Sequence, residues 1–234
     1  MKDAEIDAAL DRAARVPHPV PAELRKRIAD SIEPTMQPVR PLPPAWMLRG
    51  GLLLIGAAVA LAGAARAGFE GVEALTLPAR MLIFGMLAVL GWVAAAQVVG
   101  EWIPGSRRRF APEGLLVMAS VVLLGVFGLL FHDYRTEHFV SAGLTCLFTG
   151  LLHAAPAALL GWWLLRRGWV VNSVSAGLVA GVLAGLAGVT VLELHCANFQ
   201  ALHLLVWHVL VVPMSGAVGA MIGWGLRERA AAEP

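Results

Sequence analysis

The chain has 234 residues, of which 58% are hydrophobic and only 15% are charged. This balance excludes an ordinary soluble domain, in which about a quarter of the residues are charged. The net charge of +2 gives no reason to expect direct binding to nucleic acid, because the basic residues lie in the first fifty residues and in short gaps between long apolar runs.

Residues 1–45 predict a cytoplasmic N-terminal tail made of two short helices and a proline-rich connector. The first helix is expected near residues 4–15, and the prolines that follow end it because proline removes a backbone donor. The second helix places Leu24, Ile28 and Ile32 on one apolar stripe. This stripe is too small to support a core of its own. It predicts either a loose tail or an amphipathic segment that binds in the groove of a partner protein.

Six apolar runs follow, and most of them have the ~20 residues that a helix needs to cross a hydrocarbon core. Inside that core the backbone must satisfy its own hydrogen bonds, so the runs should be helical. The sequence therefore predicts an all-α polytopic membrane protein, with a six-helix transmembrane domain over residues 46–228 and a cytoplasmic C-terminal tail over residues 229–234. The spans are expected near residues 47–65, 81–100, 114–131, 139–165, 173–195 and 200–226.

The distribution of basic residues predicts the orientation of these spans. Fifteen of the 18 Lys and Arg residues lie in the segment through Arg49, in the second and fourth loops and at the C-terminus. The other three are Arg66, Arg80 and Arg135. Cytoplasmic loops carry the excess of Lys and Arg. Both termini are therefore expected in the cytoplasm, and a bacterial inner membrane is the expected location.

Glycines recur at helical spacing in the last two spans, where small residues allow neighbouring helices to approach closely. We expect this role, close packing, for Gly177, Gly181, Gly185 and Gly188 in the fifth span and for Gly216, Gly219 and Gly223 in the sixth.

The two cysteines are the candidate chemical site. In the predicted topology, Cys196 lies at the outer surface and Cys146 lies about 12 Å inward along its helix. The two could meet, with His195 or His203 as accessory ligands, and form a disulfide, a thiolate metal site or two inert thiols. His203 and His208 are five residues apart, which directs them about 140° apart on an α-helix, so they are not expected to share a metal.

No nucleotide-binding loop, zinc-protease motif, serine elbow or pair of intramembrane carboxylates is present, and the cytoplasmic loops leave no room for a catalytic domain. We therefore expect a protein that is not an enzyme. A sensor or regulator is favoured, and the alternative is a membrane protein that binds a metal or haem through its outer cysteines and histidines.

Several segments, taken in order, resemble one known family. The connector Pro38–Pro44 precedes the first span, and Ile103-Pro104-Gly105-Ser106 precedes three arginines. The cysteine of the fourth span is followed by Ala155-Pro156-Ala157 and by Arg166-Arg167-Gly168, and the second cysteine lies in Leu194–Phe199. Over about residues 36–228 the chain is similar to the negative-regulator-of-sigma-F family, which consists of six-span bacterial inner-membrane anti-sigma factors.

The resemblance implies a mechanism. A sigma factor of the extracytoplasmic-function class would be the protein partner, with membrane lipid around the helices, and the protein would hold that factor inactive. Cys146 and Cys196 would sense a thiol-reactive or metal stress, with no cofactor required beyond a metal ion that the pair could bind. We expect Leu24, Ile28 and Ile32 to contact the sigma factor.

Overall fold

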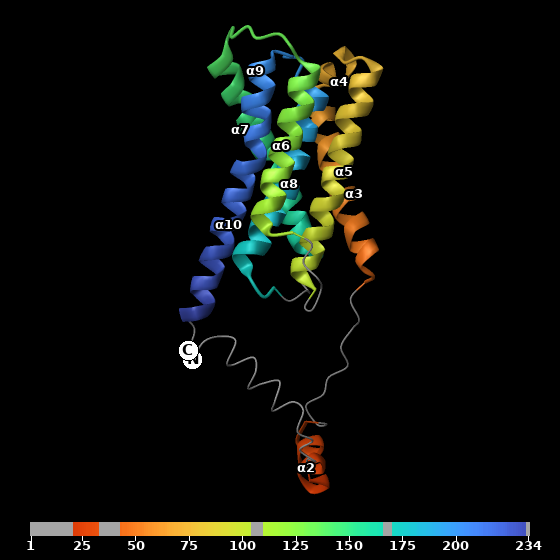
Figure 1. Ribbon diagram of the computed structural model, residues 1–234, viewed down its shortest axis with the longest axis vertical. Coiled ribbons are helices and arrows are strands. Elements are labelled where there is room, and N and C mark those ends of the chain that lie inside the picture. The colour runs from red at the N-terminus through yellow and green to blue at the C-terminus, as the bar shows by residue number, and fades with distance from the viewer. Residues whose placement is uncertain (1–20, 33–42, 104–109, 166–169, 233–234) are drawn as a thin grey trace. The chain divides into compact units, whose positions relative to one another are not determined.

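The computed structural model describes residues 21–32, 43–103, 110–165 and 170–232. Over these ranges the chain is all-α, and six helices are long and apolar enough to cross a membrane (Figure 1). The predicted fold class is confirmed, and each predicted span boundary differs from the structure by a few residues at most. The spans are α3 (Ala45–Ala67), α5 (Leu77–Trp102), α6 (Pro112–Leu130), α7 (Phe139–Leu165), α8 (Ser173–His195) and a composite sixth span, Ala201–Glu228.

The sixth span is not a uniform α-helix. It begins as the short helix α9 (Ala201–His203), continues as a π-helix (Leu204–His208) and ends in α10 (Val209–Ala232). A further short helix, α4 (Glu70–Ala74), lies between α3 and α5. Neither α4 nor the π-helix was expected from the sequence.

The chain divides into two compact units, residues 1–41 and 42–234. In the first unit the structure describes α2 (Ala22–Ile32), which is the second of the two predicted N-terminal helices. The first predicted helix, near residues 4–15, lies outside the described residues. Most of the proline-rich connector and the arginines of the second and fourth loops also lie outside them.

Local sequence explains where several spans begin and end. The first turn of α5 and that of α6 each contain a proline, at a position where no backbone donor is needed. Asn172 caps α8, because its side-chain oxygen accepts hydrogen bonds from the N–H groups of Val174 and Ser175. The same helix ends at His195, and the N–H of the following residue, Cys196, donates to the carbonyl of Leu192.

Helix α8 is the centre of the bundle and contacts each of the other spanning helices. Its glycines explain how closely they approach. A Cβ atom at Gly177 or Gly181 would meet a backbone carbonyl oxygen of α10, and one at Gly188 would meet the carbonyl of Gly150 on α7. Gly219, on α10, likewise faces the backbone of α8. The predicted close packing of the fifth and sixth spans is therefore confirmed.

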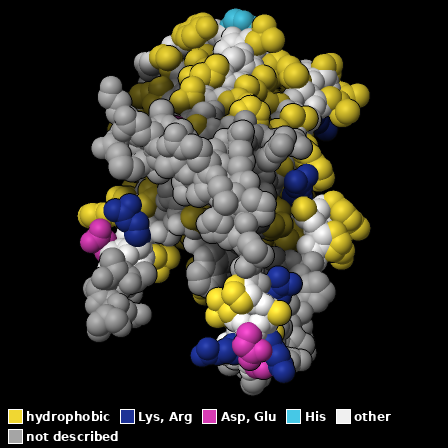
Figure 2. Space-filling model, turned by 60° about the horizontal axis from the view of Figure 1, so that its bottom comes forward, with side chains coloured by type: hydrophobic (Ala, Val, Ile, Leu, Met, Phe, Trp, Pro, Cys, Tyr) yellow, Lys and Arg dark blue, Asp and Glu magenta, His cyan; other side chains and the backbone are white. Residues whose placement is uncertain are grey.

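The outside of the bundle is apolar, as a lipid environment requires. Large hydrophobic side chains are exposed along every span except the central α8, among them Leu54, Leu129, Phe148 and Met221. In the view of Figure 2, hydrophobic side chains cover most of the described surface at the top of the picture. An exposed apolar surface of this extent is expected of helices that face lipid.

Candidate thiol and histidine site

The two cysteines meet at the end of the bundle that carries α4 and α9, which we call the α9 end (Figure 1). Cys146 lies two turns into α7, and Cys196 is the residue directly after α8. Their Sγ atoms are 3.5 Å apart, and both cysteines are free and partly buried. The structure thus brings together the two residues that the sequence analysis paired.

His203 and His208 join the cysteines. His203 Nε2 lies 3.6 Å from Cys196 Sγ, and the rings of the two histidines are 5.2 Å apart in an edge-to-face arrangement. The prediction that these histidines point away from each other is wrong. In the π-helix, the N–H of Val209 donates to the carbonyl of Leu204, five residues earlier. A turn of this length brings residues five apart towards the same side of the helix.

Glu193 completes the site and is not among the residues predicted for it. Its Oε1 atom lies 2.7 Å from Nδ1 of His208, and both side chains are fully buried. A buried carboxylate needs a partner of this kind, because an unpaired charge in an apolar interior is very costly. Glu193 precedes Cys196 by three residues, and this spacing, which places two helical residues on one face, was the available signal.

The structure does not bring His195 into this group. Its Nδ1 lies 3.5 Å from a carboxylate oxygen of Glu70 in α4, and about a third of its side chain is exposed. The neighbouring Gly71 packs on the end of α8, where a Cβ atom would meet the backbone of Cys196 and the carbonyl of Glu193. Helix α4 therefore covers the end of α8 beside Cys196, and His195 faces this cover rather than the thiols.

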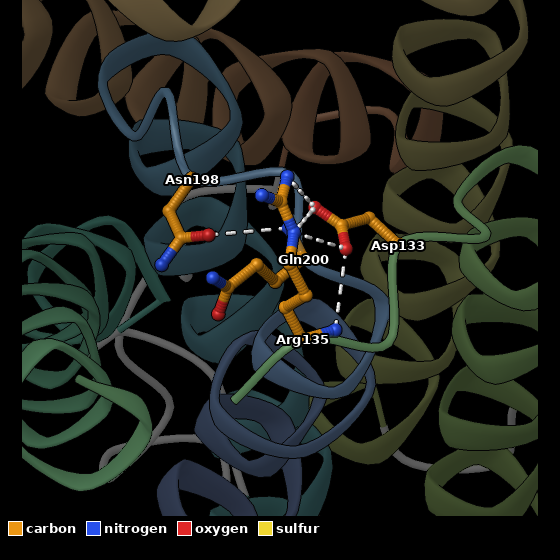
Figure 3. A network of polar contacts seen from close by, with 4 residues as sticks. All are labelled: Asp133, Arg135, Asn198 and Gln200. Carbon is orange, nitrogen blue, oxygen red and sulfur yellow. Dashed lines mark hydrogen bonds and ion pairs between the residues drawn. The ribbon is translucent and has the colours of Figure 1, made fainter. Parts of the chain in front are cut away.

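Two loops support the α9 end from the side (Figure 3). The side chain of Arg135 donates hydrogen bonds to Asp133, and the backbone oxygen of Asp133 accepts from the N–H of Ala201 at 2.6 Å. The side chain of Asn198 accepts a hydrogen bond from the N–H of Gln200. The hydrogen bonds from Arg135 hold the pKa of the Asp133 carboxyl below its ordinary value. The backbone hydrogen bond between Ala201 and Asp133 connects the start of the sixth span to the loop between α6 and α7.

The comparison with known protein families agrees with this architecture. A family model described as the negative regulator of sigma F matches residues 34–227, most of the chain. The chain belongs to this family. No curated protein and no solved structure gave a match.

A negative regulator of sigma F implies a sigma factor as the partner. The matched range contains both cysteines, both clustered histidines and Glu193. Helix α2 ends before the match begins, so family membership does not assign it a role.

Helix α2 presents the apolar face that the sequence predicts. Leu24 and Ile28 are one turn apart, and nearly half of each side chain is exposed. Ile32 lies at the end of α2, but its side chain is outside the part of the chain that the structure describes. Lys26 and Asp30 occupy the opposite side of the helix. The helix is therefore amphipathic, as a segment that binds a protein groove would be.

Proposed function

We propose that this family member is a membrane-bound anti-sigma factor that holds a sigma factor of the extracytoplasmic-function class inactive. It releases that factor when Cys146 and Cys196 react with a thiol-reactive compound or a metal. It is not an enzyme. The observation that carries the proposal is a pair of free thiols, 3.5 Å apart, in a chain that belongs to a family of negative sigma-factor regulators.

The bundle lies in a bacterial inner membrane with both termini in the cytoplasm, and the excess of Lys and Arg on that side supports this orientation. The α9 end then faces the periplasm, where thiols encounter oxidants and extracellular metals. The sigma factor meets the N-terminal segment on the cytoplasmic side, and the apolar face formed by Leu24 and Ile28 supports a contact there.

Oxidation of the pair needs a two-electron oxidant. With hydrogen peroxide, the two thiols are oxidised to one disulfide, the peroxide is reduced, and two molecules of water leave. The sulfur atoms would have to close from 3.5 Å to about 2.05 Å, the length of a disulfide bond. This movement draws the end of α8 towards α7.

Helix α8 supplies the route to the cytoplasmic side. Cys196 follows its last residue, and its first residues lie at the opposite end of the bundle. The α8–α10 contact is backbone against backbone at Gly177 and Gly181, so a displacement of α8 has to move α10 with it. A thiol event at one end of α8 therefore repacks the α8–α10 pair and weakens the contact with the sigma factor.

Co-purification tests the partner contact. The full chain, produced together with the sigma factor that it is proposed to hold, is expected to retain that factor, and deletion of residues 1–45 should abolish retention. The double variant Leu24→Ala/Ile28→Ala should weaken retention at least tenfold, because it truncates the apolar face while preserving helix propensity. Lys26→Ala/Asp30→Ala is the matched control on the opposite face. If the complex survives deletion of residues 1–45 unchanged, the role of this segment is refuted.

A reporter gene driven by the sigma factor tests the sensing step. Cys146→Ser and Cys196→Ser should each abolish induction by peroxide and by soft metals, while repression without stress remains. Retained repression shows that the variants are folded and bind the sigma factor. An unchanged induction profile in both variants would exclude the thiol pair as the sensor.

A further inference from the structure

Four metal-binding side chains converge at the α9 end. The ligand atoms of Cys146, Cys196, His203 and His208 all lie within 4.8 Å of one another. Cys196 Sγ lies 3.5 Å from Cys146 Sγ and 3.6 Å from His203 Nε2. Around one tetrahedral zinc ion, with Zn–S bonds of ~2.3 Å and Zn–N bonds of ~2.0–2.1 Å, neighbouring ligand atoms are about 3.4–3.8 Å apart. These two distances therefore match a single ion, and the widest separation among the four ligand atoms, within 4.8 Å, would have to close by up to about 1 Å on binding.

His208 provides an independent observation. Its ring is fully buried, its Nδ1 lies 2.7 Å from Glu193, and its Nε2 has no hydrogen-bond partner among the described residues. When Nδ1–H donates to the carboxylate, the lone pair on Nε2 is left available to a ligand. Histidines that bind metals almost always donate their other N–H to a carboxylate, a carbonyl or water in this way. Without a metal, this buried ring nitrogen has no well-formed hydrogen bond, which costs free energy.

The π-helix explains how two histidines of one helix contribute to one site. On an α-helix a five-residue spacing would direct them about 140° apart. The longer turn over Leu204–His208 brings them towards the same side of the helix, with their ring centroids 5.2 Å apart. A single π turn within a helix frequently marks a functional site.

We propose that Cys146, Cys196, His203 and His208 form one tetrahedral site for a divalent d10 cation, Zn²⁺ or Cd²⁺, and that Glu193 is the positioning residue for His208. On binding, two metal–sulfur and two metal–nitrogen bonds form, the two thiol protons pass to water, and no electron is transferred. The metal site can exist whether or not the protein regulates a sigma factor. The further statement, that occupancy of this site releases the factor, rests on the proposed function.

Charge favours a divalent ion over a monovalent one. With both thiols and Glu193 ionised, the site holds three negative charges among apolar helices. A divalent ion leaves one of them uncompensated and a monovalent ion leaves two, and each uncompensated buried charge is costly. Two sulfur and two nitrogen ligands in tetrahedral geometry are also the set typical of zinc.

Metal binding to the purified full chain tests the site. The protein, reduced and stripped of metal in detergent micelles, is titrated with Co²⁺, whose visible spectrum reports tetrahedral S₂N₂ coordination, and Zn²⁺ is then used to displace it. One ion per chain is expected. His203→Ala and His208→Ala should each weaken Zn²⁺ binding at least tenfold and change the Co²⁺ spectrum. His195→Gln, beside Cys196 but facing Glu70, is the matched control and should bind like the wild type.

The positioning role has its own readout. Glu193→Gln keeps the shape of the side chain but weakens its acceptor, so Zn²⁺ affinity should fall about 10–100-fold. The tetrahedral S₂N₂ spectrum of bound Co²⁺ should remain, because the four ligands are intact. A purely structural role for Glu193 would instead give the wild-type affinity in every molecule that remains folded.

Unchanged Zn²⁺ affinity in folded His203→Ala and His208→Ala variants would refute the proposed metal site. A Co²⁺ spectrum of the wild-type protein without the signature of nitrogen coordination would refute it as well. The second of these readouts requires no variant to fold. Release of the sigma factor is measured separately, by adding Zn²⁺ to the purified complex. Histidine-dependent Zn²⁺ binding without release of the sigma factor would support the metal site and refute the metal-dependent part of the proposed function. Release by peroxide without histidine-dependent Zn²⁺ binding would support the proposed function and refute the metal site.

Discussion

The contact between α8 and α10 gives the sharpest test of how this bundle is held together. At Gly181, an added Cβ atom would meet the carbonyl oxygen of Ser215 and would lie 2.8 Å from its carbonyl carbon and 2.9 Å from the Cα of Gly216. All three are backbone atoms, so no side-chain rotation can relieve the overlap. Forcing extra volume into a packed contact costs about 1–3 kcal/mol. Gly181→Ala is therefore expected to lower the free energy of unfolding by that amount.

Gly85→Ala is the matched control, because Gly85 lies within α5, is exposed, and has no atom within 4 Å of an added Cβ. There the substitution should be neutral or stabilise the helix by about 0.5–1 kcal/mol, since alanine is the better helix former. Both variants are compared by titrating the purified protein from mild detergent into SDS and following tryptophan fluorescence. If Gly181→Ala unfolds at the same SDS fraction as Gly85→Ala, close backbone contact does not hold α8 against α10.

Three further measurements test separate contacts. Asn172→Ala removes the acceptor for two backbone N–H groups at the start of α8 and should lower the free energy of unfolding by about 0.5–2 kcal/mol in the same SDS titration. A double-mutant cycle of Glu193→Ala and His208→Ala in metal-free protein should give a coupling energy of about 0.5–3 kcal/mol, because each single change leaves a buried partner unpaired, whereas additive effects would show that the pair contributes nothing. Arg135→Gln should raise the pKa of the Asp133 carboxyl towards its ordinary value, followed by NMR of the carboxyl carbon. Because the folded-state pKa is lowered, the stabilisation exists above the unfolded-state pKa and is lost only as the pH falls through the folded-state value.

The six spans were predictable because a membrane imposes length and apolarity on every segment that crosses it. Proline at the start of α5 and α6 and Asn172 at the start of α8 also follow known preferences for helix N-termini. Helix α4 was missed because a five-residue helix has too few turns to show a period. It matters nonetheless, since Gly71 packs on the end of α8 beside Cys196.

The cysteine pair was predictable from topology, which places the end of the fifth span and the outer half of the fourth on the same side. The contribution of His208 was not, because the angle between it and His203 was derived from regular α-helical geometry. That geometry does not hold in the π-helix, and no residue in Leu204–His208 indicates a π-helix from the sequence. Glu193 was not predicted as part of the site, although a helical residue shares a face with residues three or four positions away, and Cys196 is three positions away.

The site and the glycine contact together join the same pair of helices at two levels. Cys196 directly follows α8, and His203 and His208 lie in the first turns of the sixth span, so a metal ion bound by all three would fix the α9 end of the α8–α10 pair. Below it, Gly177 and Gly181 keep the two backbones in direct contact, so the two helices are expected to move together. A change in the distances between the four ligands would therefore displace α10 together with α8. Under the proposed function, that displacement would be transmitted to the opposite end of α10.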